Sequence, residues 1–153
     1  MKIDQIAYYC SNMESEYLVK ELLGLTNKIW IYDTVTARSS VWGKDGFGEN
    51  VALLQFNYDL GIELEIIRYI KGDHWHRRFL HDYPFISHVG IHLDDHEEFP
   101  AMEGAKLAQE TFTLKHTSEY LTTGPGRGRK YHYKIFEIAP RNYIKYIKRM
   151  HPS

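Results

Sequence analysis

The sequence has little cysteine, no excess of charge of either sign and no long apolar run, and each absence removes a class of protein. Cys10 is the only cysteine among 153 residues, so neither an intrachain disulfide nor a cysteine-based zinc site can form. The 19 basic and 20 acidic residues give a net charge of −1, which provides no general attraction to nucleic acid or anionic membrane. No apolar run approaches the ~20 residues of a membrane helix, and the start MKIDQIAYY lacks the apolar region of a signal peptide. We therefore expect a soluble, cytoplasmic protein that binds neither nucleic acid nor membrane.

Aromatic residues, in contrast, are abundant. They make up 14% of the chain and include twelve tyrosines. Tyrosine combines ring area with a hydroxyl group, which suits a wet cavity or an interface, and a tyrosine-rich surface would explain the same number. With 43% hydrophobic and 25% charged residues and no low-complexity tract, the chain is expected to form one globular domain over residues 1–153.

A short pattern occurs twice in the chain, 83 positions apart. KIDQIAYYCSN (residues 2–12) and FISHVGIHLDD (residues 85–95) both alternate like a strand and then become polar. Gln5 of the first copy corresponds to His88 of the second. A repeat of this kind predicts two similar modules. We place module one at 1–71, a linker at 72–84 and module two at 85–150.

The first module is predicted to be β-α-β-β-β. Its first strand leads into a helix over 13–23, which Gly24 ends. The second module repeats this plan less clearly, with a short helix near 97–102. Extended runs rich in β-branched and aromatic residues supply the other strands. These runs are 27–41, 50–58 and 62–69 in module one, and about 105–115, 131–138 and 142–149 in module two.

Alternation along the strands separates a mixed polar face from an apolar one. In both copies of the repeat the polar residue shares its face with small residues, which indicates a sheet that curves around a cavity. On the run IELEIIRY, Glu63 and Glu65 share one face, and two carboxylates there must be solvated, paired or bound to a cation. At an offset of 80, NYIKYIKR puts Tyr143 and Lys145 at the corresponding positions. The faces carry Ile3, Gln5, Ala7 and Tyr9 in the first copy and Ile86, His88, Gly90 and His92 in the second.

The chain resembles the vicinal oxygen chelate superfamily, which contains glyoxalase I, bleomycin-resistance proteins and extradiol dioxygenases. The resemblance rests on the paired modules, on the openings Ile3–Ile6 and Ile86–Val89, and on a G-x-x-x-E hairpin strand at Gly61–Glu65. It implies an α+β fold in which two βαβββ modules form an open, cupped, barrel-like sheet with helices on the outside. It also implies a homodimer, and a divalent metal ion (Zn²⁺, Ni²⁺, Mn²⁺ or Fe²⁺) that chelates vicinal oxygens of a substrate.

Carried over to this sequence, the family's four ligand-bearing positions fall on Gln5, Glu65, His88 and Lys145. The first three are the predicted metal ligands. Lys145 stands where a second carboxylate is usual, and an ammonium group has no lone pair to give. A metal-free site therefore stays open, in which Lys145 and Glu65 form a salt bridge. Extradiol cleavage is disfavoured because it commonly relies on two histidines, and only one of those positions is filled.

Two functions follow from the resemblance. One is a metal-dependent enzyme of lyase or isomerase type, acting on a small oxygen-rich substrate, with Lys145 and Glu65 as catalytic groups. The other is a metal-free binding module of the resistance-protein kind. The expected substrate-binding residues are Tyr9, His92, Tyr143 and Arg127.

Two further segments leave alternatives open. GDHWH (residues 72–76) fits packing of a loop, a gate at the cavity mouth or, through its H-x-H pair, a metal site. GPGRGRK (residues 124–130) fits either a solvated mobile loop or a segment that closes over the pocket and offers an arginine to an anionic group.

Overall fold

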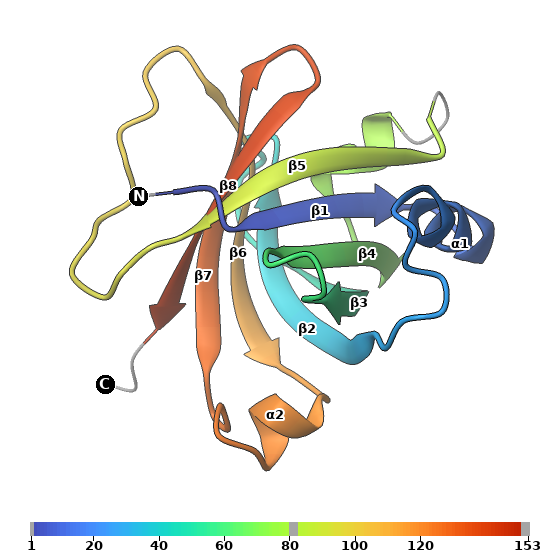
Figure 1. Ribbon diagram of the computed structural model, residues 1–153. Coiled ribbons are helices and arrows are strands. Elements are labelled where there is room, and N and C mark those ends of the chain that lie inside the picture. Colours follow the sequence, from blue (N-terminus) through green and yellow to red (C-terminus); the bar gives the residue numbers. More distant parts are fainter. Residues whose placement is uncertain (1, 80–82, 151–153) are drawn as a thin grey trace.

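The computed structural model of the protein describes residues 2–79 and 83–150, and a single sheet dominates it (Figure 1). Residues 80–82 of the predicted linker lie outside the described residues. The described strands are β1 (Gln5–Cys10), β2 (Ile31–Val41), β3 (Gly48–Asn57), β4 (Glu63–Lys71), β5 (Phe85–His92), β6 (Lys106–Lys115), β7 (Lys130–Ala139) and β8 (Asn142–Met150). The helices are α1 (Met13–Leu22), α2 (Glu119–Thr122) and the 3₁₀ turn η1 (Trp75–Arg78).

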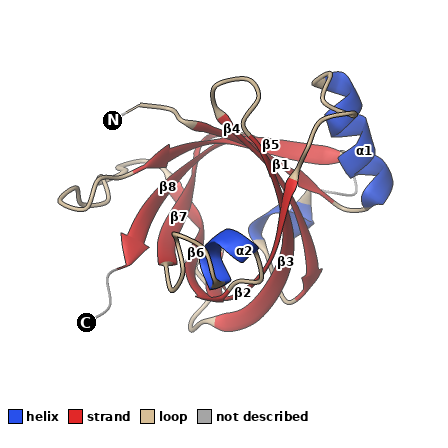
Figure 2. Cartoon of the chain, turned by 60° about the horizontal axis from the view of Figure 1, so that its bottom comes forward, coloured by secondary structure: helices blue, strands red, loops and turns tan. Residues whose placement is uncertain are grey.

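The eight strands form a closed barrel in the order β1-β4-β3-β2-β6-β7-β8-β5, and Figure 2 looks into it. The pairs β1–β4 and β5–β8 are parallel and all others are antiparallel. The sheet was expected to be open, but β2 pairs with β6 from Thr36 to Val41 and closes it. This pairing satisfies backbone groups that the two edges of an open sheet would leave without partners. The protein is thus a mostly-sheet α+β protein built around a closed barrel.

Helix α1 confirms the helix predicted over 13–23. The Asn12 side chain caps it by accepting a hydrogen bond from the backbone of Ser15 at 2.8 Å. Gly24 follows the helix with a φ of 71°, a conformation that glycine adopts without strain. Buried Val19 anchors α1 on the outside of the barrel, against Leu64 and Ile66 of β4.

The short helix predicted near 97–102 is absent, since residues 93–105 contain no helix. Phe99 and Met102 of this segment pack as a loop against the cluster of Ile91 and Tyr146. The second helix instead follows β6, where Ser118 caps α2 by accepting from the backbone of Leu121. Helix α2 lies at the rim of the barrel that faces the reader in Figure 2.

The segment GDHWH closes the barrel interior with aromatic side chains. Trp75 and His76 are fully buried there. The Trp75 backbone N–H donates to Gln109 Oε1 at 3.0 Å, and its carbonyl accepts from Trp42 Nε1 at 2.8 Å. These bonds fix the segment GDHWH to β6 and to the residue that follows the end of β2.

No helix in the described part of the chain has the length and apolar character needed to cross a membrane.

Candidate functional site

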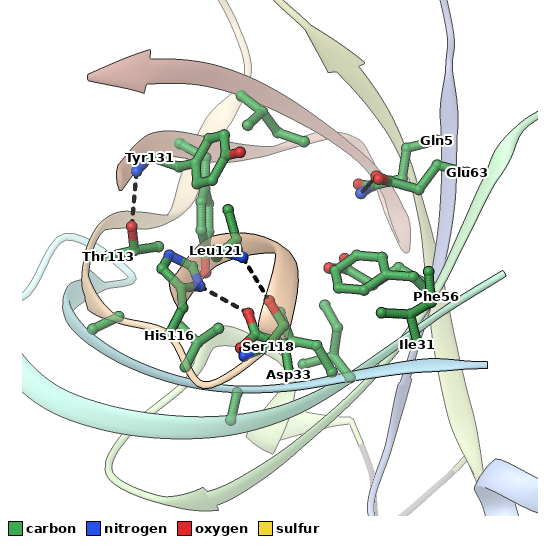
Figure 3. A pocket seen from close by; sticks show the side chains of 18 of the residues that line it. Gln5, Ile31, Asp33, Phe56, Glu63, Thr113, His116, Ser118, Leu121 and Tyr131 are labelled. Carbon is green, nitrogen blue, oxygen red and sulfur yellow. Dashed lines mark hydrogen bonds and ion pairs between the residues drawn. The ribbon is translucent and has the colours of Figure 1, made fainter. Parts of the chain in front are cut away.

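The barrel encloses a cavity of about 200 Å³. Tyr58 and Tyr120 line it and are about half exposed, so the cavity reaches solvent beside these two rings. Its apolar wall comes from inward-facing strand positions, as the alternation predicts. Polar side chains lie on opposite sides of it, with Asp33 and His116 on one side and Gln5 and Glu63 on the other (Figure 3). The apolar lining includes Ile31, Val35, Leu54, Phe56, Ile67 and Ile147.

A buried ion pair forms part of the cavity wall. Lys145 Nζ lies 3.5 Å from Glu65 Oε1, and the two side chains are only 6% and 4% exposed. The same ammonium group lies 4.3 Å from the centre of the Tyr133 ring. Burial raises the pKa of Glu65, although the neighbouring Lys145 charge acts in the opposite direction. The two residues come from β4 and β8, which β1 and β5 separate in the sheet, so the pair connects the two halves of the barrel across its interior.

Gln5 and His88 also contact each other. Gln5 Oε1 lies 3.3 Å from His88 Nε2, and Gln5 Nε2 donates to Glu63 Oε2. Gly90 makes room for this amide, since a Cβ at Gly90 would lie 2.5 Å from Gln5 Oε1. His88 is buried behind Gln5 and does not line the cavity. Burial, followed by the charge of Lys145, holds the pKa of His88 well below its usual value, so its imidazole is neutral.

The donor set around Glu65 fits an ion pair better than a metal ion. The Lys145 ammonium group occupies the position beside the Glu65 carboxylate that a metal cation would need. A second cation there would also be repelled by that ammonium group. The described residues contain no group of three or more His, Cys, Asp or Glu side chains that could hold a metal ion.

A second polar cluster in the cavity was not anticipated from the sequence. His116 Nδ1 lies 2.8 Å from Asp33 Oδ2, and Asp33 Oδ1 accepts the backbone N–H groups of Thr117 and Ser118 at 2.8 and 2.9 Å. Burial alone would raise the pKa of Asp33, but these hydrogen bonds outweigh it and lower the pKa. Asp33 and His116 are 83 residues apart, which is the offset of the sequence repeat.

The predicted substrate-binding residues lie in different places. His92 lines the cavity, and its Nδ1 lies 2.8 Å from Asp4 Oδ1. Tyr9 is fully buried, with its ring against that of Trp75. Tyr143 also packs against Trp75, and its hydroxyl donates to Glu137 at 2.8 Å. Arg127 is exposed in the loop after α2. Of this set, the structure brings only His92 to the cavity with Gln5, Glu65 and Lys145.

The structure also shows where the segments GDHWH and GPGRGRK lie. In GDHWH, the His74 ring stacks on Tyr69 at 4.5 Å, and burial lowers the pKa of His74 to about 4. Neither His74 nor His76 lines the cavity, so the segment acts as internal packing. GPGRGRK folds back on α2, where Arg129 donates to the Tyr120 hydroxyl at 2.9 Å. The Tyr120 ring packs directly on Gly126, where a Cβ would lie 2.3 Å from it and would require the ring to move.

Comparison with models of known protein families gave no match, and no curated protein sequence matches the chain.

Replacing Asp33 with asparagine is expected to lower the free energy of unfolding by about 2 kcal/mol at pH 7, because a charged hydrogen-bond acceptor is lost. Since the pKa of Asp33 is lowered in the folded state, its stabilising effect is present above the pKa of an unfolded aspartate, ~4. That effect disappears as the pH falls through the folded-state pKa. The deficit should therefore be largest at neutral pH and vanish in acid.

Urea unfolding at pH 7 and pH 3 measures this deficit. Asp45→Asn, at an exposed position, is the matched control and should change little at either pH. An equal deficit for Asp33→Asn at both pH values would contradict the prediction.

Proposed function

We propose that the protein binds a small organic molecule that carries oxygen atoms, inside the barrel and without a metal ion. The observation that carries this proposal is the cavity of about 200 Å³, whose apolar wall is interrupted by a few polar side chains. Pockets of this composition are typical of small-molecule sites, in which the apolar wall gives affinity and the polar groups fix orientation. The buried ammonium group of Lys145 suits an oxygen of the ligand as a partner.

The arrangement of the strands supports the resemblance to the vicinal oxygen chelate superfamily. Contacts join residues at the repeat offset: Gln5 with His88 and Asp33 with His116 are 83 apart, and Glu65 with Lys145 are 80 apart. The parallel pair β1–β4 likewise corresponds to the parallel pair β5–β8. We therefore retain two modules of βαβββ ancestry as part of the proposal, with the second module's helix displaced. A cytoplasmic homodimer, which the resemblance implies, also belongs to the proposal.

Binding is tested with p-cresol, a small aromatic probe with one hydroxyl group, by following backbone amide chemical shifts. We expect shifts at cavity residues that saturate with probe concentration. Ala52→Phe should abolish them, because inward-facing Ala52 lines the cavity and a phenyl ring there would fill it. Ile70→Phe adds the same ring at an exposed position of β4 and should bind as the wild type does. Saturable binding that Ala52→Phe leaves unchanged, in a folded protein, would contradict the location.

The metal-dependent enzyme remains the second candidate. One observation favours it, since Gln5 Oε1 and His88 Nε2 lie only 3.3 Å apart and could both reach one ion. Under our proposal, protein purified without chelator contains no stoichiometric Zn²⁺, Ni²⁺, Mn²⁺ or Fe²⁺, and EDTA leaves the melting temperature unchanged. Elemental analysis and thermal unfolding measure both quantities. A tightly bound ion that disappears in His88→Ala and Glu65→Ala would replace the metal-free proposal with the enzyme.

A further inference from the structure

The strongest unassigned feature of the cavity is the pair formed by Asp33 and His116. The Asp33 carboxylate is the acceptor of its hydrogen bonds. Oδ1 accepts from the backbone N–H groups of Thr117 and Ser118 and from the Thr117 hydroxyl, and Oδ2 contacts the imidazole of His116. A carboxylate cannot donate, so His116 Nδ1 must carry the proton of the 2.8 Å contact with Asp33 Oδ2. The pair thereby fixes which nitrogen of the ring is protonated.

The other ring nitrogen of His116 has nothing to bond within the described part of the chain. Nε2 is buried and without a hydrogen-bond partner there, and His116 lines the cavity. The side chain is only 8% exposed, and that of Asp33 only 2%. A buried nitrogen without a partner costs free energy unless a ligand or water supplies one. In the neutral ring, Nε2 has a free lone pair and is an acceptor.

We propose that the Asp33–His116 pair is a general-base site, in which His116 Nε2 accepts a proton from a hydroxyl group, or from a C–H next to a carbonyl, of the molecule bound in the cavity. The proposal rests on the proposed binding function and adds a reaction to it. In the step, the O–H or C–H bond of the ligand breaks, its electron pair stays on the ligand, and a new N–H bond forms at Nε2.

The surroundings of the pair suit this step. The imidazolium that forms would be stabilised by the Asp33 carboxylate, which holds the Nδ1 proton without taking it over because two backbone N–H groups favour its charged form. The negative charge left on the ligand would face a cavity that Lys145 also lines. Asp33 is a positioning residue in this scheme, and His116 is the catalytic one.

A purely structural role is the competing explanation, since the pair also ties the start of β2 to the segment that leads into α2. Two measurements test the proposal. Nitrogen-15 NMR of the wild type reports which nitrogen of His116 is protonated, and we expect Nδ1–H with Nε2 bare. In Asp33→Asn the preference for this tautomer should disappear. The hydrogen bond requires this tautomer in either role, so the second measurement, a rate of ester hydrolysis, separates a general base from packing alone.

Activity is tested with p-nitrophenyl acetate, because general-base attack of water on this ester gives acetate and p-nitrophenol and needs only an imidazole nitrogen with a free lone pair beside the bound ester. Wild-type protein should hydrolyse it faster than buffer alone does. His116→Gln should lower the protein-dependent rate at least ~100-fold, the lower end of the range typical of a lost general base. His96→Gln, at an exposed position, should retain the wild-type rate.

The outcomes are distinguishable from failure of the proposed function. Saturable p-cresol binding, together with hydrolysis that His116→Gln leaves unchanged, would overturn the general base and keep the binding site. A wild-type tautomer with Nε2–H would overturn it as well, and this measurement decides the matter if His116→Gln does not fold. Absence of p-cresol binding would instead remove the proposed function, on which the reaction depends.

Discussion

Replacing Lys145 with methionine is expected to lower the free energy of unfolding by about 3–5 kcal/mol at neutral pH, the range for breaking a buried ion pair from one side. The reason is that Glu65 would keep its buried position, with its side chain 4% exposed, and lose the ammonium group that balances its charge. Methionine preserves most of the lysine volume, so little of the effect would come from an empty space. Urea unfolding followed by circular dichroism measures the change.

The size of this effect should depend on pH in a defined direction. Burial already raises the pKa of Glu65 in the wild type, and without Lys145 that burial would act unopposed. A carboxyl group whose pKa is raised in the folded state destabilises the fold while it is charged, so the deficit is largest well above that pKa. It shrinks as the pH falls and the group becomes protonated in the folded state too. A deficit that is constant from pH 8 to pH 4 would contradict this account.

Two matched variants isolate the ion pair. Lys148→Met removes a second lysine of β8, which pairs with the largely exposed Glu98, and should cost no more than about 0.5 kcal/mol. The double variant Lys145→Met, Glu65→Leu removes both charges and should recover most of the stability, since an apolar pair avoids the cost of burying either charge. Recovery in the double variant would show that the unpaired carboxylate, rather than altered packing, causes the loss.

The strands were predictable because their physical signal is local. Period-two alternation assigns each side chain of a strand to one face, and the turn ending at Gly61, with a φ of 78°, is a glycine signal. The inward face predicted for Gln5 and Glu65 is therefore the one that the structure shows. What alternation does not give is the partner across the sheet, which depends on register between strands that are distant in sequence.

The Asp33–His116 pair illustrates this limit. The repeat offset that relates Gln5 to His88 also relates Asp33 to His116, since both pairs are 83 residues apart. Asp33 is nevertheless one polar residue within a long run of β-forming residues, and His116 follows the end of a strand. Neither position by itself therefore indicates a functional site. Only the closure of the barrel by β2 and β6 brings the two side chains together.

Closure itself could not be derived from the sequence. The resemblance implied an open sheet, and the pairing of β2 with β6 includes a register shift between Thr36 and Ala37 that no residue pattern announces. The position of GDHWH was open for the same reason. Its residue types suit a loop, a gate or a metal site equally. The position of the segment is set by the buried space that the Trp75 ring fills against Tyr9 and Tyr143.

Replacing Trp75 with alanine is the second change with a large expected effect, a loss of about 3–5 kcal/mol in the free energy of unfolding. The indole is fully buried, and its ring centre lies 4.9 Å from that of Tyr9 and 4.1 Å from that of Tyr143. Because strands on both sides are fixed by the barrel ladder, the space it leaves cannot collapse completely. Tyr32→Ala, at a position 63% exposed on β2, is the control and should cost no more than about 0.5 kcal/mol.

Two further measurements make this test specific to the site that Trp75 fills. Free indole should restore part of the lost stability, since an apolar cavity of this kind can bind a ligand of matching shape. The variant should also lose some of the acid sensitivity of the wild type. Burial lowers the pKa of His74 to about 4 and that of His76 well below its usual value, so wild-type stability falls as the pH drops below ~6.5, where unfolded histidines take up protons. Water admitted beside His76 would reduce that difference between the folded and unfolded states. A Trp75→Ala variant with an unchanged pH profile and no response to indole would show that the tryptophan does not shield the histidines.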